Sequence, residues 1–324
     1  MATIKEVAKL AGVSLITVSR VVNTPEKVAA ETRKKVEAAM KKLGYVANVT
    51  AQNLVAKRSG IICVYASHTF SRLDPFLSCF LVGVSEGLSE RGYSMSLIHD
   101  VNQAQFCDGY IFSGHNYSET AFDECKKFGK PMALFGSCDD ENIDCIDTDN
   151  VKTARKIVSY LIENGHRKIA VVLNNIEADY VSQRYEGYAE ALNEAGIAVD
   201  PSLVFTVENS IDGGTDAASM YLSAQKQASA VFLITDIMAV GFVLAMQAKG
   251  KKVPDDVSVA GFDGLGHQNL TEPKITTVVQ PVYEISKLLA SSILSRIMDG
   301  RKERFCRLIE GEVKVEGSVK RIKE

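Results

Sequence analysis

The sequence predicts an α/β protein in which a small all-helical segment precedes two larger, doubly wound α/β lobes. Three observations predict it. Residues 3–45 carry only helical patterns, whereas from residue 61 onward short apolar strands alternate with amphipathic helices. The charge also divides there: residues 1–58 hold eleven Lys and Arg against four Asp and Glu, a net +7, while all 324 residues together carry −3. Such a basic end is expected where it alone meets phosphate, although well-solvated helices would show the same excess.

Two short helices, about 5–10 and 15–22, are expected on either side of a turn at Gly12. Thr3 and Ser14 stand where a helix N-cap is preferred, and glycine supplies the backbone freedom that the turn needs. Small alanine and valine side chains on both helices allow them to cross closely. The expected local fold is therefore a helix, a tight turn and a second helix.

A third helix is expected over 31–43, because apolar side chains share one face there, and Gly44 ends it. Residues 48–57 form one more short helical pattern, which stops before Ser59. A helix of this length is not stable alone in water. We therefore expect this segment to fold on contact with a partner.

The rest of the chain predicts two parallel sheets with a cleft between them. Nine short apolar strands that alternate with helices, such as 151–164 and 183–195, exceed one compact sheet and indicate layers covered on both faces. Open sheets of this kind bind ligands at the carboxyl ends of their strands. Asp212–Gly214 is expected to form an ordinary turn. The candidate strands are 61–66, 94–99, 109–114, 131–136, 143–147, 168–174, 202–207, 229–235 and 257–262.

Other patterns exclude classes of function. The seven cysteines show no CxxC spacing, and an odd count without a secretory leader predicts reduced thiols and a cytoplasmic protein. No apolar run approaches the roughly 18–20 residues that span a bilayer, so no membrane partner is expected. The five histidines are isolated, and His166 is expected at a helix C-terminus. We therefore expect no enzymatic activity, no metal and no cofactor.

Residues 4–23, IKEVAKLAGVSLITVSRVVN, are the most informative segment. In a helix-turn-helix motif the second helix enters the DNA major groove and presents its first residues to the base edges. Leu15 and Ile16 come first, and as apolar side chains they suit thymine methyl groups. Arg20, one turn later, suits O6 and N7 of a guanine, and nearby hydroxyl groups suit phosphates. The alternative is a helical hairpin with an ordinary packing turn.

The same segment resembles the headpiece of the lactose/galactose-repressor (LacI/GalR) family, whose signature is close to TIxDVAxxAGVSxxTVSRVLN. On a collinear match along the whole chain, the sequence is identified as a member of that family. The resemblance implies a sequence-specific DNA-binding transcriptional regulator with a helix-turn-helix headpiece, a hinge helix and two lobes of periplasmic-binding-protein-like type. The further matching segments are ETRKKVEAAMKKLGY (31–45), NVTAQNLVAKRSG (48–60), DGYIF (108–112), DTDN (147–150), YLIENGHRKIA (160–170), RYEGYAEALNEAGI (184–197), ITDIMAVG (234–241), VPDDVSVAGFD (253–263) and ITTVVQP (275–281).

The resemblance also implies domain limits and a homodimer. Two headpieces on inverted half-sites multiply the specificity that one alone would give, so the DNA partner is expected to be a double-stranded, pseudo-palindromic operator. The implied limits are 1–47 for the headpiece, 48–59 for the hinge, and 60–324 for the effector-binding and dimerisation domain, with 60–148 and 277–307 in the N-lobe and 149–276 and 308–324 in the C-lobe.

For DNA binding, the resemblance assigns base contacts to the first turns of the second helix and a wedge to the hinge. Leu54 is expected to enter the minor groove and to kink the duplex at a flexible step. The family usually has proline where this chain has Ala47, so the segment before the hinge is less pre-set. The implied base readers are Leu15, Ile16 and Arg20; the backbone contacts or their supports are Ser14, Thr17, Ser19, Asn23 and Tyr45; the hinge residues are Asn48, Ala51 and Leu54.

For effector binding, the resemblance points to four residues in the cleft. Arg184 is expected to clamp ligand hydroxyls or a carboxylate, Asp263 and Asp236 to accept bonds from hydroxyls, and Phe76 to stack on a sugar ring. Each has an ordinary structural alternative: a surface ion pair for Arg184, an Asp-Gly turn for Asp263, a helix cap for Asp236 and core packing for Phe76.

Two departures from the family leave the effector open. Thr235 stands where the family usually has asparagine, and a Thr-Asp pair also occurs in the catabolite-control branch, which answers to a phosphorylated carrier protein. Only residues 101–108 connect two strands between which the family normally has a helix. The hypotheses are thus a repressor of a carbohydrate-utilisation operon with a sugar or sugar-phosphate effector, or a regulator with a phosphorylated protein co-effector. A stand-alone sugar-binding module fits the headpiece poorly.

Overall fold

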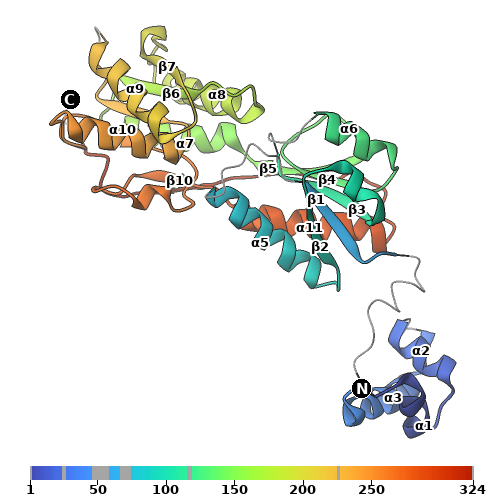
Figure 1. Cartoon of the computed structure of the whole chain (residues 1–324). Coiled ribbons are helices and arrows are strands. Elements are labelled where there is room, and N and C mark those ends of the chain that lie inside the picture. The colour runs from blue at the N-terminus through green and yellow to red at the C-terminus, as the bar shows by residue number, and fades with distance from the viewer. Residues whose placement is uncertain are drawn as a thin grey trace. The chain divides into compact units, whose positions relative to one another are not determined.

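The structure is a computed structural model that describes residues 2–23, 27–45, 58–65, 74–114, 119–224 and 227–322 (Figure 1). The chain divides into two compact units. The first comprises Met1–Ile61 with Phe106–Asp108, and the second comprises Ile62–Gln105 with Gly109–Glu324.

The first unit contains the three predicted helices, α1 (Ile4–Ala11), α2 (Leu15–Asn23) and α3 (Ala30–Leu43). The side chain of Thr3 caps α1, where it forms a reciprocal capping box with Glu6. Gly12 takes the left-handed conformation, with φ of 65°, at the turn. The predicted caps and turn are therefore confirmed.

The core of this unit is small but closed. Val7, Val18 and Val36, one from each helix, are fully buried, and Ala8 and Ala39 fill the spaces between them. In the last described segment of this unit, the backbone N–H groups of Ser59 and Gly60 each donate to the carboxylate of Asp108, with N···O distances of 2.9 Å. The predicted hinge segment, 48–57, lies outside the described residues.

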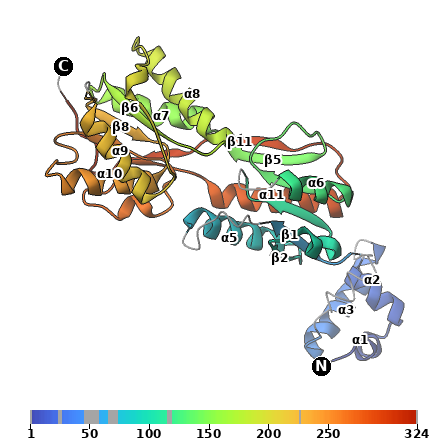
Figure 2. The same ribbon diagram turned by 45° about the horizontal axis from the view of Figure 1, so that its top comes forward.

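The second unit has two sheets, each with its own helices. The N-lobe is built on a six-stranded sheet in the order β11-β5-β4-β3-β1-β2. Helices α5 and α11 lie side by side on one face of this sheet, and α6 lies on the other (Figures 1 and 2). The N-lobe elements are β1 (Ile61–Tyr65), α5 (Pro75–Ser89), β2 (Ser94–Ile98), β3 (Gly109–Phe112), α6 (Glu119–Lys127), β4 (Met132–Phe135), β5 (Ile143–Thr148), α11 (Val282–Met298) and β11 (Cys306–Ile309).

Successive side chains of β3 pack on opposite faces of the N-lobe sheet. Ile111 belongs to the core under α5 and α11, whereas the ring of Phe112 meets that of Phe122 on α6, with centroids 5.1 Å apart. Successive side chains of a strand point to opposite faces, so a sheet covered on both sides needs an apolar residue at each position. This explains the almost continuous apolar strands of the sequence.

The C-lobe has a four-stranded sheet in the order β7-β6-β8-β9, in which neighbouring strands are parallel. A two-stranded antiparallel pair, β10 with β12, lies at the crossings between the lobes. The elements are α7 (Asn150–Glu163), β6 (Ile169–Asn174), α8 (Asp179–Glu194), η3 (Pro201–Leu203), β7 (Val204–Val207), α9 (Ile211–Ser223), β8 (Ala230–Leu233), α10 (Asp236–Ala248), β9 (Ser258–Ala260), η4 (His267–Asn269), β10 (Thr277–Val279) and β12 (Glu312–Lys314).

Two local predictions for the C-lobe were wrong. Asp212–Gly214 is not a turn but part of the first turns of α9, which the side chain of Ser210 caps. A Cβ atom on Gly214 would collide with the carbonyl oxygen of Met238 on α10, so the glycine serves the close crossing of two helices. Helix α8 begins at Asp179, four residues before the predicted start.

The chain crosses between the lobes after β5, between β10 and α11, and between β11 and β12. The N-lobe sheet keeps β11 to Ile309, and β10 pairs with β12 rather than with that sheet. The exact lobe limits inferred from the sequence stay a prediction. Where the family normally has a helix, β2 is followed only by the short 3-10 helix η2 (Val101–Phe106). In the described part of the chain, no helix is long and apolar enough to cross a membrane.

Candidate functional site

The second helix of the headpiece presents apolar side chains on its surface. Leu15 and Ile16 are 43% and 66% exposed at its first turn, whereas Val18 and Val21 on the opposite side belong to the core. The hydroxyl of Ser14 accepts the backbone N–H of residue 17 at 3.1 Å and fixes the start of the helix. This arrangement leaves the first residues of α2 available for an outside partner.

The other predicted DNA contacts differ in their surroundings. Arg20 is exposed on α2, and Ser19 and Thr17 are half-buried. Tyr45 packs against the headpiece core from the end of α3, which suits a supporting role. Asn23 ends α2, but its side chain is outside the described part. Asn48, Ala51 and Leu54 also lie outside the described residues.

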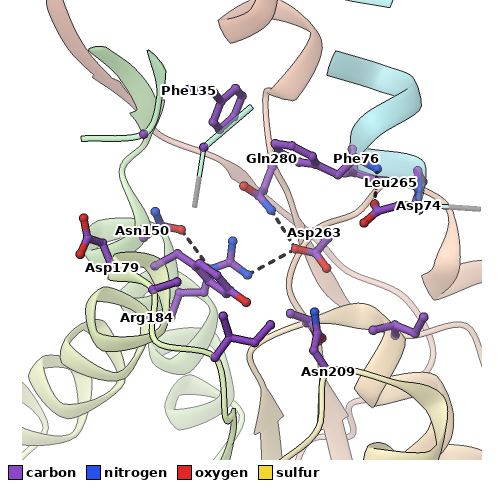
Figure 3. A pocket seen from close by; sticks show the side chains of 18 of the residues that line it. Asp74, Phe76, Phe135, Asn150, Asp179, Arg184, Asn209, Asp263, Leu265 and Gln280 are labelled. Carbon is purple, nitrogen blue, oxygen red and sulfur yellow. Dashed lines mark hydrogen bonds and ion pairs between the residues drawn. The ribbon is translucent and has the colours of Figure 1, made fainter. Parts of the chain in front are cut away.

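A cavity of about 1080 Å³ opens between the two lobes of the second unit. Both lobes and the crossing segments contribute to its wall, at the carboxyl ends of the sheet strands (Figure 3). Of the four predicted effector residues, Phe76, Arg184 and Asp263 line this cavity, and Asp236 does not.

Arg184 is held rigidly in the C-lobe wall. Its guanidinium carbon lies 3.7 Å from the ring centroid of Phe262 and 4.8 Å from that of Tyr180. Its Nε donates to Oδ1 of Asn150 at 3.0 Å, and its Nη1 donates to the carbonyl of residue 234 at 2.6 Å. The side chain is 5% exposed, and burial lowers its pKa, although arginine stays protonated at any ordinary pH.

Asp263 is the counter-ion of this arginine, with 3.3 Å between its Oδ1 and Nη1 of Arg184. The same oxygen accepts the side-chain N–H of Gln280 at 2.8 Å. Burial raises the pKa of Asp263, while Arg184 opposes the rise. The residue has a φ of 138°, a conformation that side chains other than glycine rarely adopt and that clusters at ligand sites.

Asp236 supports this arrangement from behind. It is fully buried at the first position of α10. Its Oδ1 accepts the hydroxyl of Thr277 at 2.6 Å, and its Oδ2 accepts the backbone N–H of Gly264 at 2.8 Å. Oδ2 therefore holds the loop after Asp263, and Oδ1 holds β10. This arrangement favours a positioning role, and a direct contact of Asp236 with an effector stays a prediction.

The N-lobe wall is aromatic. Phe76 stacks on Phe80, with centroids 6.2 Å apart and planes 5° apart, and meets Phe135 edge-on at 5.1 Å. Asp74 caps α5 in the same wall by accepting the backbone N–H of residue 76 at 2.9 Å. Figure 3 shows Phe76 and Phe135 across the cavity from Arg184.

Acidic side chains dominate the charge of the cavity. Among its described lining residues, Arg184 and His267 are the only basic ones. Burial raises the pKa of Asp147 to about 7 and also raises the pKa of Asp74. The carboxyl groups that stay ionised would repel an anionic ligand, and the raised pKa values reduce the charge of Asp74 and Asp147 in that field. The six acidic lining residues are Asp74, Asp147, Glu177, Asp179, Glu208 and Asp263.

Four amide residues in the wall were not singled out from the sequence: Asn150, Asn175, Asn209 and Gln280. Asn150 and Gln280 connect Arg184 and Asp263 to the crossing segments, where Oε1 of Gln280 also accepts the hydroxyl of Thr148 at 3.0 Å. Both stand in motifs that the family resemblance includes, DTDN and ITTVVQP. Asn209 lies in none of the motifs that match the family, yet its Oδ1 accepts the hydroxyl of Thr235 at 2.7 Å. An amide thus lines the cavity beside the position where the family usually has asparagine.

Comparison with known families agrees with this two-part organisation. Residues 3–48 match the family model described as bacterial regulatory proteins, lacI family. Residues 158–319 match the model of the periplasmic binding protein-like domain.

Individual relatives match nearly the whole chain. The HTH-type transcriptional regulator YvdE of Bacillus subtilis (strain 168) is 31% identical over 92% of this chain and 93% of its own length. Catabolite control protein A of Priestia megaterium is 32% identical over 92% of each chain. Among solved structures, that of the transcriptional regulator CelR–cellobiose complex has a TM-score of 0.75 at 29% identity and covers 98% of this chain and all of its own.

Proposed function

Because the chain belongs to the LacI family of bacterial DNA-binding transcriptional regulators, we propose that it is a cytoplasmic, homodimeric repressor of a carbohydrate-utilisation operon. In this proposal a neutral, polyhydroxylated sugar in the cleft controls its affinity for operator DNA. The family consists of regulators rather than enzymes, and the proposal includes no catalytic step.

The headpiece supports the proposed role in DNA recognition. Leu15 and Ile16 place bare methyl groups at the start of α2, where the recognition helix of this motif meets base edges. Exposed to water, these apolar side chains contribute no binding free energy. Contact with thymine methyl groups removes them from water, which is favourable. Arg20 follows on the same helix and suits a guanine.

The ion pair at the cleft carries the proposal for the effector. Arg184 and Asp263 together offer fixed donors and acceptors, and Phe76 faces them with an apolar ring. A sugar ring has hydroxyl groups on its rim and C–H bonds on its faces, so it matches both walls at once. The ionised carboxyl groups among the six acidic lining residues favour a neutral sugar over a sugar phosphate. The related CelR structure contains cellobiose, a neutral disaccharide.

A homodimer completes the proposed mechanism. One face of α5 leaves Val82 57% exposed, and this residue lines a shallow groove with Leu81 and Met95, which suits contact with a second copy. An effector that closes or opens the lobes would change the spacing of two hinge segments and so shift the population that binds DNA.

Two measurements test this function. Selection of bound duplexes from a random-sequence pool should yield an inverted repeat. Leu15→Ala and Arg20→Ala should each relax one separate base position, at a cost of about 1–3 kcal/mol. If both variants selected the wild-type sequence with the wild-type affinity, α2 would not be the recognition helix.

The effector is tested by thermal unfolding of the full chain with cellobiose, ribose, maltose and, for contrast, glucose 6-phosphate. A neutral sugar should raise the melting temperature and alter binding to the selected operator, and Asn209→Ala should reduce that effect. Stabilisation by the phosphate alone would contradict the argument from cleft charge. No response to any neutral sugar, together with DNA binding that depends on a phosphorylated carrier protein, would favour the protein co-effector.

A further inference from the structure

A pair of thiols outside the proposed recognition residues lies where the loop between β4 and β5 meets the N-lobe sheet. The Sγ atoms of Cys138 and Cys145 are 3.2 Å apart. Cys138 is half-buried in the loop between β4 and β5, and Cys145 is on β5 with 5% of its surface exposed. Disulfide-bonded sulfurs lie about 2.04 Å apart, so a shift of roughly one ångström by this loop would bring the pair within bonding distance.

The pair has a fixed cation beside it. Nη2 of Arg304 lies 3.6 Å from Sγ of Cys145 and 4.0 Å from Sγ of Cys138. The guanidinium is held in place because Nη2 also donates to the carbonyl of Cys138 and Nε donates to the carbonyl of Ile143 at 3.0 Å. An adjacent cation stabilises a thiolate, which is the reactive form of cysteine.

The two thiols differ in accessibility, which sets their order of reaction. Burial raises the pKa of Cys145 to about 12, so this thiol keeps its proton. Cys138 is the more accessible of the two to a reagent from solvent. Cys138 is therefore placed to react first, and Cys145 is placed to resolve the mixed disulfide.

We propose that Cys138 and Cys145 form a reversible disulfide site that reacts with low-molecular-weight disulfides such as oxidised glutathione. The Cys138 thiolate attacks one sulfur of the reagent; a mixed disulfide forms, and one thiolate leaves. That leaving thiolate takes the proton of Cys145, whose sulfur attacks Sγ of Cys138 and displaces the second thiolate. Two protein thiols are oxidised, and one reagent disulfide is reduced to two thiols.

The disulfide would act on the wall of the cleft. Ser137, the residue before Cys138, lines the cavity, and its hydroxyl donates to Oδ2 of Asp179 on the C-lobe at 3.2 Å. A covalent bond from Cys138 to β5 would restrict the loop that carries this contact between the lobes. The oxidation state of the pair would thus be transmitted to the cleft, whatever ligand the cleft takes.

The test uses the full chain, treated with oxidised glutathione, followed by alkylation of free thiols. Cleavage after Glu141 separates the two cysteines in sequence, so the fragments stay joined only through a disulfide. Wild type should give the joined fragments, and dithiothreitol should separate them. Cys138→Ser and Cys145→Ala should give none, and Arg304→Gln should slow the reaction about tenfold.

Cys306→Ser is the matched control. Cys306 is exposed on β11 and is the register partner of Cys145, so it offers a reactive thiol in the same region. This variant should form the joined fragments as wild type does. Only mixed disulfides with glutathione, or a bond that requires Cys306, would overturn the assignment.

Amide hydrogen exchange of residues 136–142 tests the link to the cleft without a sugar. Exchange there should slow on oxidation and recover with dithiothreitol in wild type, and should not respond in Cys138→Ser. Unchanged exchange in a fully oxidised sample would refute the transmission to the cleft. Because neither readout uses operator or effector, failure of the proposed regulation would leave both results interpretable.

Discussion

The two walls of the cleft are built in opposite ways. The C-lobe wall holds Arg184 between two aromatic rings, with hydrogen bonds to Asn150 and an ion pair to Asp263. The N-lobe wall offers the ring of Phe76 and an irregular loop with Ser137. The first wall is pre-set by buried polar contacts, whereas the second is mainly aromatic and includes an exposed loop. We infer that the C-lobe wall determines which hydroxyl groups are bound, and that the N-lobe wall adapts to them.

The largest expected effect is the loss of the cation from the rigid wall. Arg184→Ala would leave the half-buried carboxylate of Asp263 without its counter-ion, and the loss in unfolding free energy should approach the value of about 3–5 kcal/mol typical of a broken buried pair. It should also abolish the thermal response to a neutral sugar. Chemical denaturation measures the first effect and sugar titration the second.

Arg155→Ala is the matched control, because Arg155 is 37% exposed and pairs with Glu194 at 2.7 Å on the C-lobe surface. It should cost about 0–1 kcal/mol and keep the sugar response. Equal losses from the two variants would contradict the idea that the C-lobe wall is the pre-set one.

The importance of this wall is only partly visible in the sequence. Arg184 and Asp263 were identified by matching motifs, and the structure brings them together at the cavity. Gln280 was not, because its role depends on lying beside Thr148, 132 positions away in the sequence. Sequence periodicity reports which face of an element is buried, but it does not report which crossing segments meet. The same limit applies to Asp236, whose motif does not reveal that a loop covers it.

Sequence motifs predicted local structure correctly where that structure depends on neighbouring residues. The capping box of Thr3 with Glu6 and the turn at Gly12 depend on residues close in sequence, and both were predicted. The same reasoning was wrong for Gly214. A Gly-Gly pair favours a turn when considered in isolation, but the close contact with α10 accounts for the place of Gly214 in α9. The strands were predicted because a strand that is buried on both faces has an apolar residue at almost every position.

The next effect is a pH dependence in the acidic lining. Burial raises the pKa of Asp147 to about 7 from an ordinary 3.8, so above about pH 4 the folded protein binds a proton that the unfolded chain releases. The contribution of protonated Asp147 to the free energy of unfolding is complete below about pH 4 and is lost as pH rises to about 7. Asp147→Asn should therefore be more stable than wild type at pH 8, by about 1–2 kcal/mol after allowance for partial exposure.

Urea denaturation between about pH 5 and pH 8 checks this sign. The advantage of Asp147→Asn should grow with pH and level off above about pH 7. An advantage that is constant across this range would mean that Asp147 is ionised in the folded protein throughout.

Truncation of the aromatic wall should affect ligand binding more than folding. Phe76→Ala removes the stacking surface, and we expect sugar affinity to fall about tenfold, which corresponds to about 1.4 kcal/mol. The half-buried ring should contribute less to stability than a core phenylalanine. Phe80→Ala is the contrast, because Phe80 is fully buried and its truncation should cost about 3–5 kcal/mol. Calorimetric titration with the sugar found in the thermal screen measures the affinity.

The smallest expected effect concerns the loop in the adaptable wall. Ser137→Ala removes the hydroxyl that donates to Asp179, and an exposed hydrogen bond of this kind contributes about 0.5–1 kcal/mol or less. Overall stability should hardly change, but the sugar concentration needed to alter operator binding should shift a few-fold, because the hydrogen bond joins the two lobes. Ser182→Ala is the control, since its hydroxyl donates within α8, to the carbonyl of Asp179, and to no other residue among those described. A shift of the same size in both variants would place the adaptable element elsewhere than in the N-lobe wall.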